Sequence, residues 1–508
     1  MVSLLYLHTE DSPTIDCLEN LSLNRIVEEI CYTGERSEYV LSILKRPLQD
    51  IDNIVYRQEI CRDFIAHPKL FDEMTEICRA YNQLKEEWDK ASRQVRTQIG
   101  ASHAYTHSLD LVRDTISTLE TNAAYCYKIT GFPQSLLQIL ESYPIQSQGL
   151  RSIQTFCMER MQDPNYLRFR EIAAELSEVA PMIDKGCELS VDFNDSLYAV
   201  AEHLVKVKTQ NQEQKQSLFA ALFNRAKHNS GATQTSGVTV TLSGASTNEV
   251  VVMINEALKE VSALIVQITK GIYPTFANLS QELWFYRFVI KLHSIYEREK
   301  VPVCYPQMLP AAEDVFYCED LYDLLLLVKD YGLKQPLFDV VPNDVKLASQ
   351  NVGMLVQGDN NSGKTTFLRS IGIAQVFAQA GLPIAAKTAA MSIRSNILAQ
   401  FSGEDTVAGN DSAGRFESEV REVAQIIDQL QPYSLVLFNE TFQTTAFAEA
   451  ATAIFDILDV ISQVKIKWIF VTHLMQLYEM FSRTDDKVIF MQTSKDSKMR
   501  YKLVPMDF

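Results

Sequence analysis

Residues 358–365 constrain the fold of this chain more than any other stretch. They read GDNNSGKT and fit the pattern G-x-x-x-x-G-K-[ST], whose backbone curls around phosphate oxygens. A short apolar run at 353–356 precedes the stretch, and apolar residues at helical spacing follow it from 367 to 376. A loop between a buried strand and a helix N-terminus points its N–H groups at an anion. We therefore expect a nucleotide-binding loop inside an α/β domain, and the alternative is a surface turn that matches by chance.

The residue types of this loop suit the phosphates of ATP. Gly358 and Gly363 let the backbone approach the phosphate oxygens. Lys364 is expected to reach the β- and γ-phosphates, and the Thr365 hydroxyl is expected to bind Mg²⁺. ATP and Mg²⁺ are therefore the expected cofactors. The other residues here that we assign to nucleotide binding are Asn360, Ser362 and Thr366.

Length and composition limit the remaining possibilities. The chain has 508 residues, which suggests about three domains, and no apolar run approaches the roughly 20 residues of a membrane helix. The N-terminus lacks a basic region and becomes acidic at once, so we expect no signal peptide. Nine cysteines without a C-x-x-C pair suit reduced thiols in a cytoplasmic protein. A net charge of −17 gives no general attraction to nucleic acid, so DNA would have to meet a local patch or a closed ring.

The first part of the chain has helical patterning. Residues 1–160 are expected to form a helical core, in which segment 45–74 stands out. Pro47 marks an expected helix boundary there, and the apolar residues after it have the spacing of an amphipathic helix. The plain interpretation of this segment is a helix pair in a bundle. Residues 165–224 are expected to be helical and polar.

A long-helix arm is expected over residues 161–300. Apolar residues recur from Ile254 to Ile272 at steps of 4, 3, 4, 3 and 4, which is a heptad-like seam. Pro274 is expected to kink or interrupt this helix because it removes a backbone donor. The simplest architecture has two long helical segments that flank a tip. The alternative is an ordinary helical bundle with a surface loop.

The expected tip lies at residues 228–248, where Gly, Ser and Thr dominate. Residues 238–242 alternate as a strand does, and they could pair with 249–253 as a hairpin. A flexible linker explains the composition equally well.

Residues 301–508 are expected to form an α/β domain, because short apolar runs separated by turns replace the helical pattern. The apolar run 433–438 leads to Asn439 and Glu440. In ATPases of the transporter-like (ABC) class, an Asp for the metal and a Glu for the attacking water stand at this place. Glu440 fits the role of base. Asn439 supplies no negative charge, so we expect weakened support for Mg²⁺.

Two further features complete the expected ATPase site. Residues 465–471 (KIKWIFV) are expected to form another buried strand that delivers His473, which is expected to sense the γ-phosphate, although a structural histidine is the alternative. Residues 411–415 read DSAGR and resemble the ABC signature, a helix N-terminus that meets the γ-phosphate held by another subunit. A plain serine helix cap is the alternative. Either Ser412 or Gly414 can take the place of the signature serine.

These motifs are similar to those of the MutS family of DNA mismatch-repair ATPases. Asn360 lies inside the phosphate loop, and residues 341–344 (VPND) resemble a family segment that lies against adenine. Residues 380–383 (AGLP) resemble a family stretch after the phosphate-loop helix, and Phe416 with Glu419 matches the F-x-x-E of the signature helix. Six residues of this chain resemble the start of the family's helical core domain: Pro47, Leu48, Ile54, Arg57, Gln58 and Phe64. The resemblance is strong in the α/β domain and weak in the arm.

The chain also departs from the family pattern. The family's mismatch-reading domain, with its Phe-x-Glu wedge, would precede the first residue, and its helix-turn-helix dimer element would follow Phe508. Asn439 replaces the metal-binding Asp, and residues 441–445 (TFQTT) replace a G-R-G-T-S-type loop. We therefore expect a short MutS-like protein with core, lever and ATPase domains and no mismatch-recognition domain.

The resemblance implies a multidomain fold: an all-α helical core with a long-helix arm, and then an α/β P-loop (ABC-type) ATPase domain. It implies a homodimer in which ATP binding closes the two ATPase domains and clamps mismatched, branched or distorted duplex DNA in repair or recombination. The DNA would be recognised by shape, other repair proteins are further partners, and no membrane is involved. Val341 and Asn343 are expected to pack on the base, and Ser412 to reach across the dimer. The alternative is a nucleotide-gated scaffold that hydrolyses ATP poorly and contacts protein partners, which the net acidity and Asn439 favour.

Overall fold

The structure is a computed structural model that describes residues 2–31, 34–102, 122, 124–183, 187–193, 199–207, 237–242, 248–330, 340–401, 412–441, 447–484 and 487–506. The chain divides into two compact units. Unit 1 contains Met1–Val2, Lys69–Ile145 and Leu150–Ser280, and unit 2 contains Ser3–Pro68, Gln146–Gly149 and Gln281–Phe508.

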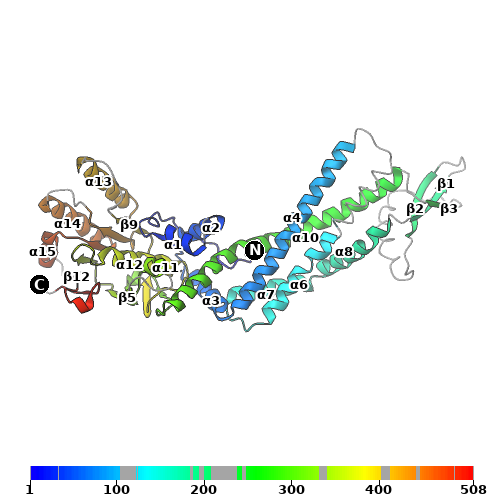
Figure 1. Ribbon diagram of the computed structural model, residues 1–508. Coiled ribbons are helices and arrows are strands. Elements are labelled where there is room, and N and C mark those ends of the chain that lie inside the picture. The colour runs from blue at the N-terminus through cyan, green and yellow to red at the C-terminus, as the bar shows by residue number, and fades with distance from the viewer. Residues whose placement is uncertain are drawn as a thin grey trace. The chain divides into compact units, whose positions relative to one another are not determined.

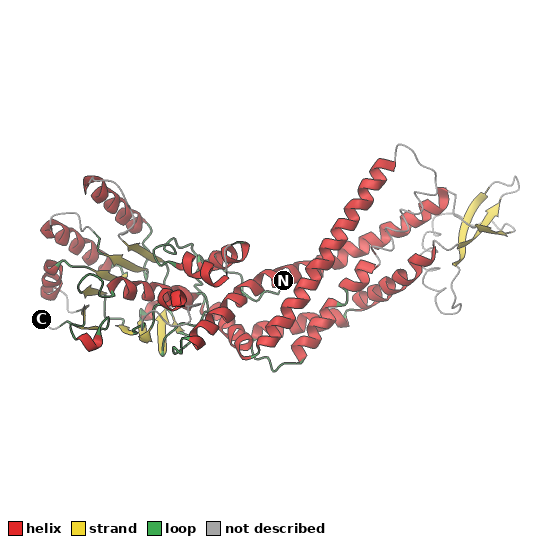
Figure 2. Cartoon of the chain, in the orientation of Figure 1, coloured by secondary structure: helices red, strands yellow, loops and turns green. Residues whose placement is uncertain are grey.

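Unit 1 consists of long helices and a small antiparallel sheet (Figure 1). Its helices are α4 (Pro68–Ser102), α6 (Phe132–Glu141), α7 (Gln148–Gln162), α8 (Pro164–Ile183) and the first part of α10 (Asn248–Arg298). Its strands, β1 (Cys187–Phe193), β2 (Ala199–Val207) and β3 (Gly237–Leu242), pair in the order β2-β1-β3 and are drawn in yellow in Figure 2. None of the helices in the described part of the chain combines the length and the apolar character that crossing a membrane requires.

Aromatic side chains hold the helices of unit 1 together. Tyr81 of α4 stacks on Phe276 of α10 with ring centroids 4.9 Å apart, and Phe132 at the start of α6 meets the Tyr81 ring edge-on at 5.3 Å. Tyr81 and Phe276 are almost fully buried. Offset and edge-to-face aromatic pairs add to the free energy gained by burying their area. This cluster fixes α4, α6 and α10 against one another.

The structure corrects three local expectations in this unit. Residues 187–193 and 199–207 form strands, although the segment 165–224 was expected to be helical. The expected strand at 238–242 is present as β3, but it pairs with β1, while 249–253 belong to α10. Pro274 is expected to kink or interrupt the helix, and interruption is wrong, because α10 continues through Pro274 and loses only one backbone donor. The rest of the expected tip, 228–236 and 243–247, lies outside the described residues.

Unit 2 surrounds two sheets with helices. A six-stranded sheet has the order β13-β12-β7-β11-β10-β9, and all of its neighbouring pairs are parallel except β12 with β13. These strands are β7 (Gly353–Gln357), β9 (Ile397–Phe401), β10 (Leu435–Asn439), β11 (Lys467–Val471), β12 (Val488–Thr493) and β13 (Leu503–Pro505). The second sheet, of order β4-β8-β5-β6, contains β4 (Gln307–Leu309), β5 (Phe316–Leu321), β6 (Asn343–Leu347) and β8 (Thr388–Ser392). The helices are α1 (Leu23–Cys31), α2 (Glu35–Leu44), α3 (Ile51–Ala66), α11 (Leu324–Asp330), α12 (Lys364–Gln379), α13 (Ser412–Asp428), α14 (Phe447–Gln463), α15 (Met475–Thr484) and the last part of α10.

The central strands are buried on both faces. Every residue of β10 and β11 is buried, as the continuous apolar runs in the sequence predict for parallel strands covered by helices. Trp468 of β11 is fully buried and lies over Gly353, where an added Cβ would come within 2.2 Å of the indole ring. Gly353 is therefore required by the close approach of this side chain.

The C-terminal end of α12 is tied to the N-terminal helices of unit 2. Leu48 donates its N–H to the Gln379 carbonyl at 3.0 Å, and the Gln379 amide donates back to the Leu48 carbonyl at 2.9 Å. The fully buried Arg57 of α3 donates to the Ala380 carbonyl at 3.3 Å and to the Leu5 carbonyl at 2.7 Å. The helix that follows the phosphate loop is thus anchored on α3.

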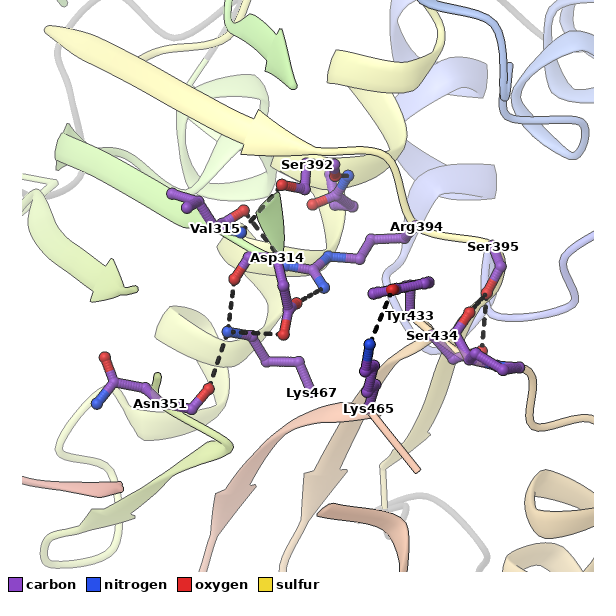
Figure 3. Close-up of polar contacts among 12 residues, drawn as sticks. Asp314, Val315, Asn351, Ser392, Arg394, Ser395, Tyr433, Ser434, Lys465 and Lys467 are labelled. Carbon is purple, nitrogen blue, oxygen red and sulfur yellow. Dashed lines mark hydrogen bonds and ion pairs between the residues drawn. The ribbon is translucent and has the colours of Figure 1, made fainter. Parts of the chain in front are cut away.

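A buried charged cluster joins the two sheets of unit 2 (Figure 3). Arg394 Nη1 lies 2.5 Å from Asp314 Oδ1, and Lys467 Nζ lies 3.3 Å from Asp314 Oδ2. The Lys467 ammonium also donates to the carbonyls of Asp314, Ala348 and Asn351 at 2.7, 2.9 and 2.9 Å. Lys467 begins β11, so this cluster lies at the opposite end of the strand from the candidate site.

Candidate nucleotide site

Three parallel strands end together and place the expected site residues. Val356 of β7, Val471 of β11 and Asn439 of β10 are in register across the sheet. The phosphate loop follows β7, Glu440 follows β10, and His473 lies two residues beyond β11. Ligands of open α/β sheets bind at the carboxyl ends of the strands. The three segments that the sequence analysis singled out are therefore neighbours in space.

The phosphate loop has the backbone that its glycines predict. Gly363 caps α12 with φ 94°, a left-handed conformation that favours glycine. A Cβ on Gly358 would lie 2.2 Å from Thr493 Oγ1, so only glycine fits there. The Ser362 hydroxyl is buried and has no hydrogen-bond partner among the described residues. A buried hydroxyl without a partner fits a bound phosphate oxygen.

Lys364 meets the other candidate residues where the loop closes. Its ammonium donates to the carbonyls of Gly358 and Asp359 at 2.8 and 2.9 Å, and it lies 3.5 Å from Glu440 Oε1. The side chain is 4% exposed. Burial lowers the pKa of Lys364, and the attraction of Glu440 opposes this shift. A phosphate bound in the loop would add further negative charge beside this buried cation.

Glu440 and His473 lie within hydrogen-bond distance of each other beside Lys364. His473 Nε2 lies 2.9 Å from Glu440 Oε1 and 3.4 Å from Lys364 Nζ. Because a carboxylate can only accept and Glu440 is the nearer partner, we assign a proton to Nε2, where it is donated to Glu440. Glu440 has φ 56°, and its N–H donates to the Val471 carbonyl at 2.8 Å. This left-handed conformation turns the residue out of β10, and the hydrogen bond ties it to β11.

Thr365 and Asn439 meet at the expected metal position. The Thr365 hydroxyl donates to Asn439 Oδ1 at 3.0 Å, and Asn439 is 6% exposed. The hydroxyl and the amide are both neutral, so the pair offers oxygen atoms to Mg²⁺ but no charge. Asn360 and Thr365 are exposed, and Thr366 is half-buried at the start of α12. The oxygen donors fit a hydrated Mg²⁺ that a nucleotide brings with it.

The segment 341–343 lies beside a C-terminal turn that the sequence analysis missed. Asn343 is buried, its amide donates to the Tyr501 carbonyl at 3.1 Å, and its Oδ1 accepts the Leu503 N–H at 2.7 Å. Tyr501 has φ 68°, and its ring carbon Cδ1 lies 3.4 Å from the ideal Cβ position on Gly363. The Asn343 side chain thus holds an aromatic residue against the phosphate loop. Positive φ and contact with a distant loop have no signature in the local sequence, so no motif could have identified Tyr501.

The signature segment is described only in part. Helix α13 begins at Ser412, so Ser412 and Gly414 both lie in its first turn. Asp411 lies outside the described residues. An N-terminal turn is where a helix offers free N–H groups to an anion, as the sequence analysis expects of this segment.

The fold and this site define a multidomain protein that joins a helical unit to an α/β domain with a candidate nucleotide site. A family model described as MutS domain V matches residues 354–504, and a model described as the MutS2 N-terminal domain matches 49–298. Together these matches span most of the chain, and the chain belongs to the MutS family.

Individual relatives match a shorter segment. The chain is 32% identical over 138 residues to the DNA mismatch repair protein MutS of Granulibacter bethesdensis, which is 27% of this chain and 15% of that protein. It is 33% identical over 138 residues to the Endonuclease MutS2 of Streptococcus equi subsp. equi, which is 27% of this chain and 18% of that protein. It is 31% identical over 148 residues to the Endonuclease MutS2 of Clostridium botulinum, which is 28% of this chain and 18% of that protein. The matches thus cover less than a fifth of the length of these relatives.

Proposed function

We propose that this chain is a MutS-type ATPase that binds ATP with Mg²⁺ at the carboxyl ends of β7, β10 and β11. The observation that carries the proposal is the meeting of Lys364, Glu440 and His473, whose charged or polar atoms lie 2.9 to 3.5 Å apart. A buried cation, a carboxylate and a histidine of this arrangement match the parts that phosphoryl transfer to water requires.

Each residue has a role in this proposal. Lys364 exchanges its carbonyl partners for the β- and γ-phosphates, which also receive backbone N–H groups between Gly358 and Gly363. Glu440 orients the attacking water and accepts its proton, and His473 senses the γ-phosphate. Thr365 and Asn439 would hold Mg²⁺, which would supply positive charge to the phosphates. Val341 borders the base, and Asn343 positions the segment beside it.

The coupling to DNA belongs to the same proposal. Ser412 or Gly414 of one copy meets the nucleotide of a second copy, and closure of the homodimer clamps mismatched, branched or distorted duplex DNA. We retain the division into a helical core (1–160), an arm (161–300) and an ABC-type ATPase domain (301–508) as part of the proposal. The eight cysteines whose side chains are described are free, which suits a cytoplasmic location.

A nucleotide-gated scaffold is the second candidate. Its specific support is the hydrogen bond between Thr365 and Asn439, which puts a neutral amide where a carboxylate would strengthen metal binding. The net charge of −17 also disfavours general contact with DNA. In this case the chain binds ATP, hydrolyses it slowly and presents its arm to protein partners.

Steady-state ATP hydrolysis separates these two functions. The purified chain is assayed alone and with homoduplex, mismatched and branched DNA at low salt, where the phosphate contribution to DNA binding is largest. Stimulation by one DNA form supports the DNA-coupled enzyme and identifies its substrate. Tight ATP binding with little turnover and no DNA effect supports the scaffold.

Replacing Asn439 with aspartate should strengthen Mg²⁺-dependent nucleotide binding by about tenfold, because a charge-assisted contact is worth roughly twice a neutral one. The measurement is a Mg²⁺ titration of ATP binding, read beside the rate of hydrolysis. Asn439→Ala serves as the matched control and should weaken the Mg²⁺ response, since it removes the acceptor of the Thr365 hydroxyl. An unchanged Mg²⁺ midpoint in both variants would place the metal elsewhere.

A further inference from the structure

A buried glutamine connects the residue after Glu440 to α13. Gln400 lies near the end of β9, opposite Phe438 of β10, and is 3% exposed. The Thr441 hydroxyl donates to Gln400 Oε1, and Gln400 Nε2 donates to Glu422 Oε2 at 3.2 Å. Glu422 belongs to α13. One amide therefore accepts from the segment beside the candidate base and donates to the candidate signature helix.

The conformation of Glu440 makes this connection important. Its φ of 56° is unfavourable for a residue with a side chain, so neighbouring contacts must hold it. The hydrogen bond of the Glu440 N–H to Val471 holds the residue from the β11 side. Thr441, which is 2% exposed, holds it from the β9 side through Gln400. The backbone from which the Glu440 side chain extends is therefore held by both neighbouring strands.

We infer that Gln400 is a positioning residue that makes hydrolysis depend on the position of α13. This inference rests on the proposed function, in which Glu440 orients water and the N-terminus of α13 meets the nucleotide of a second copy. When α13 is seated, Glu422 accepts from the Gln400 amide, Gln400 accepts from Thr441, and Glu440 is held in its working direction. When α13 moves away, the amide loses its carboxylate partner and the hold on Thr441 weakens. The phosphate loop connects β7 to α12, and Lys364 is the first residue of α12. ATP binding therefore requires none of the contacts of Gln400.

The test compares Gln400→Met and Thr441→Val in the full chain. Gln400→Met keeps the length of the side chain and removes both hydrogen bonds, and Thr441→Val removes only the donor to Gln400. We expect each variant to lower kcat by about 10- to 100-fold, because small misplacement of a catalytic group costs up to about 100-fold. The Kd for ATP should stay within about twofold. The double variant should be no slower than the worse single variant, since both break one chain of contacts.

A control on the same helix isolates this effect. Arg421→Ala breaks the exposed Arg421–Glu417 pair of α13, whose nitrogen and oxygen lie 2.7 Å apart, and it should leave kcat unchanged. Glu422→Gln, which keeps an acceptor oxygen, should restore most of the activity that Glu422→Ala loses. Equal melting curves would show that Gln400→Met is folded. If its kcat then equals that of the wild-type protein, the inference is overturned and the proposed function is not. A wild-type chain without any turnover would overturn both the inference and the proposed function.

Discussion

Replacing Glu440 with glutamine should reduce ATP turnover by at least about 100-fold while ATP remains bound. A general base contributes about 10²- to 10⁴-fold to a reaction, and an amide cannot accept the proton of the attacking water. Glu440 also places a negative charge 3.5 Å from Lys364, at the position where we expect the γ-phosphate. Removing this charge lowers the repulsion of ATP, so the Kd for ATP should stay equal or decrease. Single-turnover hydrolysis and equilibrium ATP binding measure the two effects separately.

The control for this variant is an exposed glutamate that is not one of the site residues. Glu479 of α15 is 65% exposed and pairs loosely with Arg483, so Glu479→Gln should retain the wild-type rate. Normal hydrolysis by Glu440→Gln would show that another group orients the water. Loss of both binding and turnover would instead show that Glu440 mainly holds Lys364 and His473 in place.

The sequence predicted the parts of the site that lie at strand ends. Buried parallel strands appear as uninterrupted apolar runs, so the strands before the phosphate loop, Glu440 and His473 could be recognised and their polar ends expected at one edge. The contacts of Gln400 and Tyr501 could not be predicted in this way. Tyr501 meets Asn343 across 158 residues of chain, and Gln400 meets Thr441 across 41. Neither pair belongs to a local motif, and only the folded sheet brings its members together.

The expected structures of 187–193 and of the partner of β3, both in unit 1, differ from the observed ones for a shared physical reason. Residues 187–193 read CELSVDF, in which apolar side chains alternate with polar ones, but the polar composition of the surrounding segment favoured a helix. The partner of β3 was expected immediately after the Gly/Ser-rich turn because hairpins pair local segments. The actual partner is β1, which begins at Cys187, 50 residues before β3 begins at Gly237. Cys187 lies opposite Leu242 at one end of the pair, and Asp192 lies opposite Gly237 at the other. The residues around β3 carry no information about a partner strand so distant in the chain.

Replacing Lys467 with methionine should destabilise unit 2 by about 3 kcal/mol, since removing one member of a buried ion pair commonly costs this much. The substitution leaves the carbonyls of Asp314, Ala348 and Asn351 without the ammonium that they share. Lys465→Met is the matched control, because Lys465 stands two residues earlier and its exposed ammonium lies 3.3 Å from the Tyr433 hydroxyl and over the Tyr433 ring (Figure 3). This control should change stability by less than about 0.5 kcal/mol. Urea unfolding followed by tryptophan fluorescence reports the effect, since Trp468 adjoins Lys467.

The stabilising effect of Lys467 should also depend on pH. Burial lowers the pKa of Lys467 to about 8, with Arg394 adding to the shift and Asp314 opposing it. An unfolded lysine keeps its ordinary pKa of 10.5, so between about pH 8 and 10.5 the unfolded chain binds more protons at this position than the folded chain. Stability from this residue therefore rises with pH across that window and is constant below it. The difference in unfolding free energy between wild type and Lys467→Met should grow from pH 8 to pH 10. A constant difference would mean that the three carbonyls and Asp314 compensate fully for burial, and that Lys467 remains charged in the folded protein throughout this range.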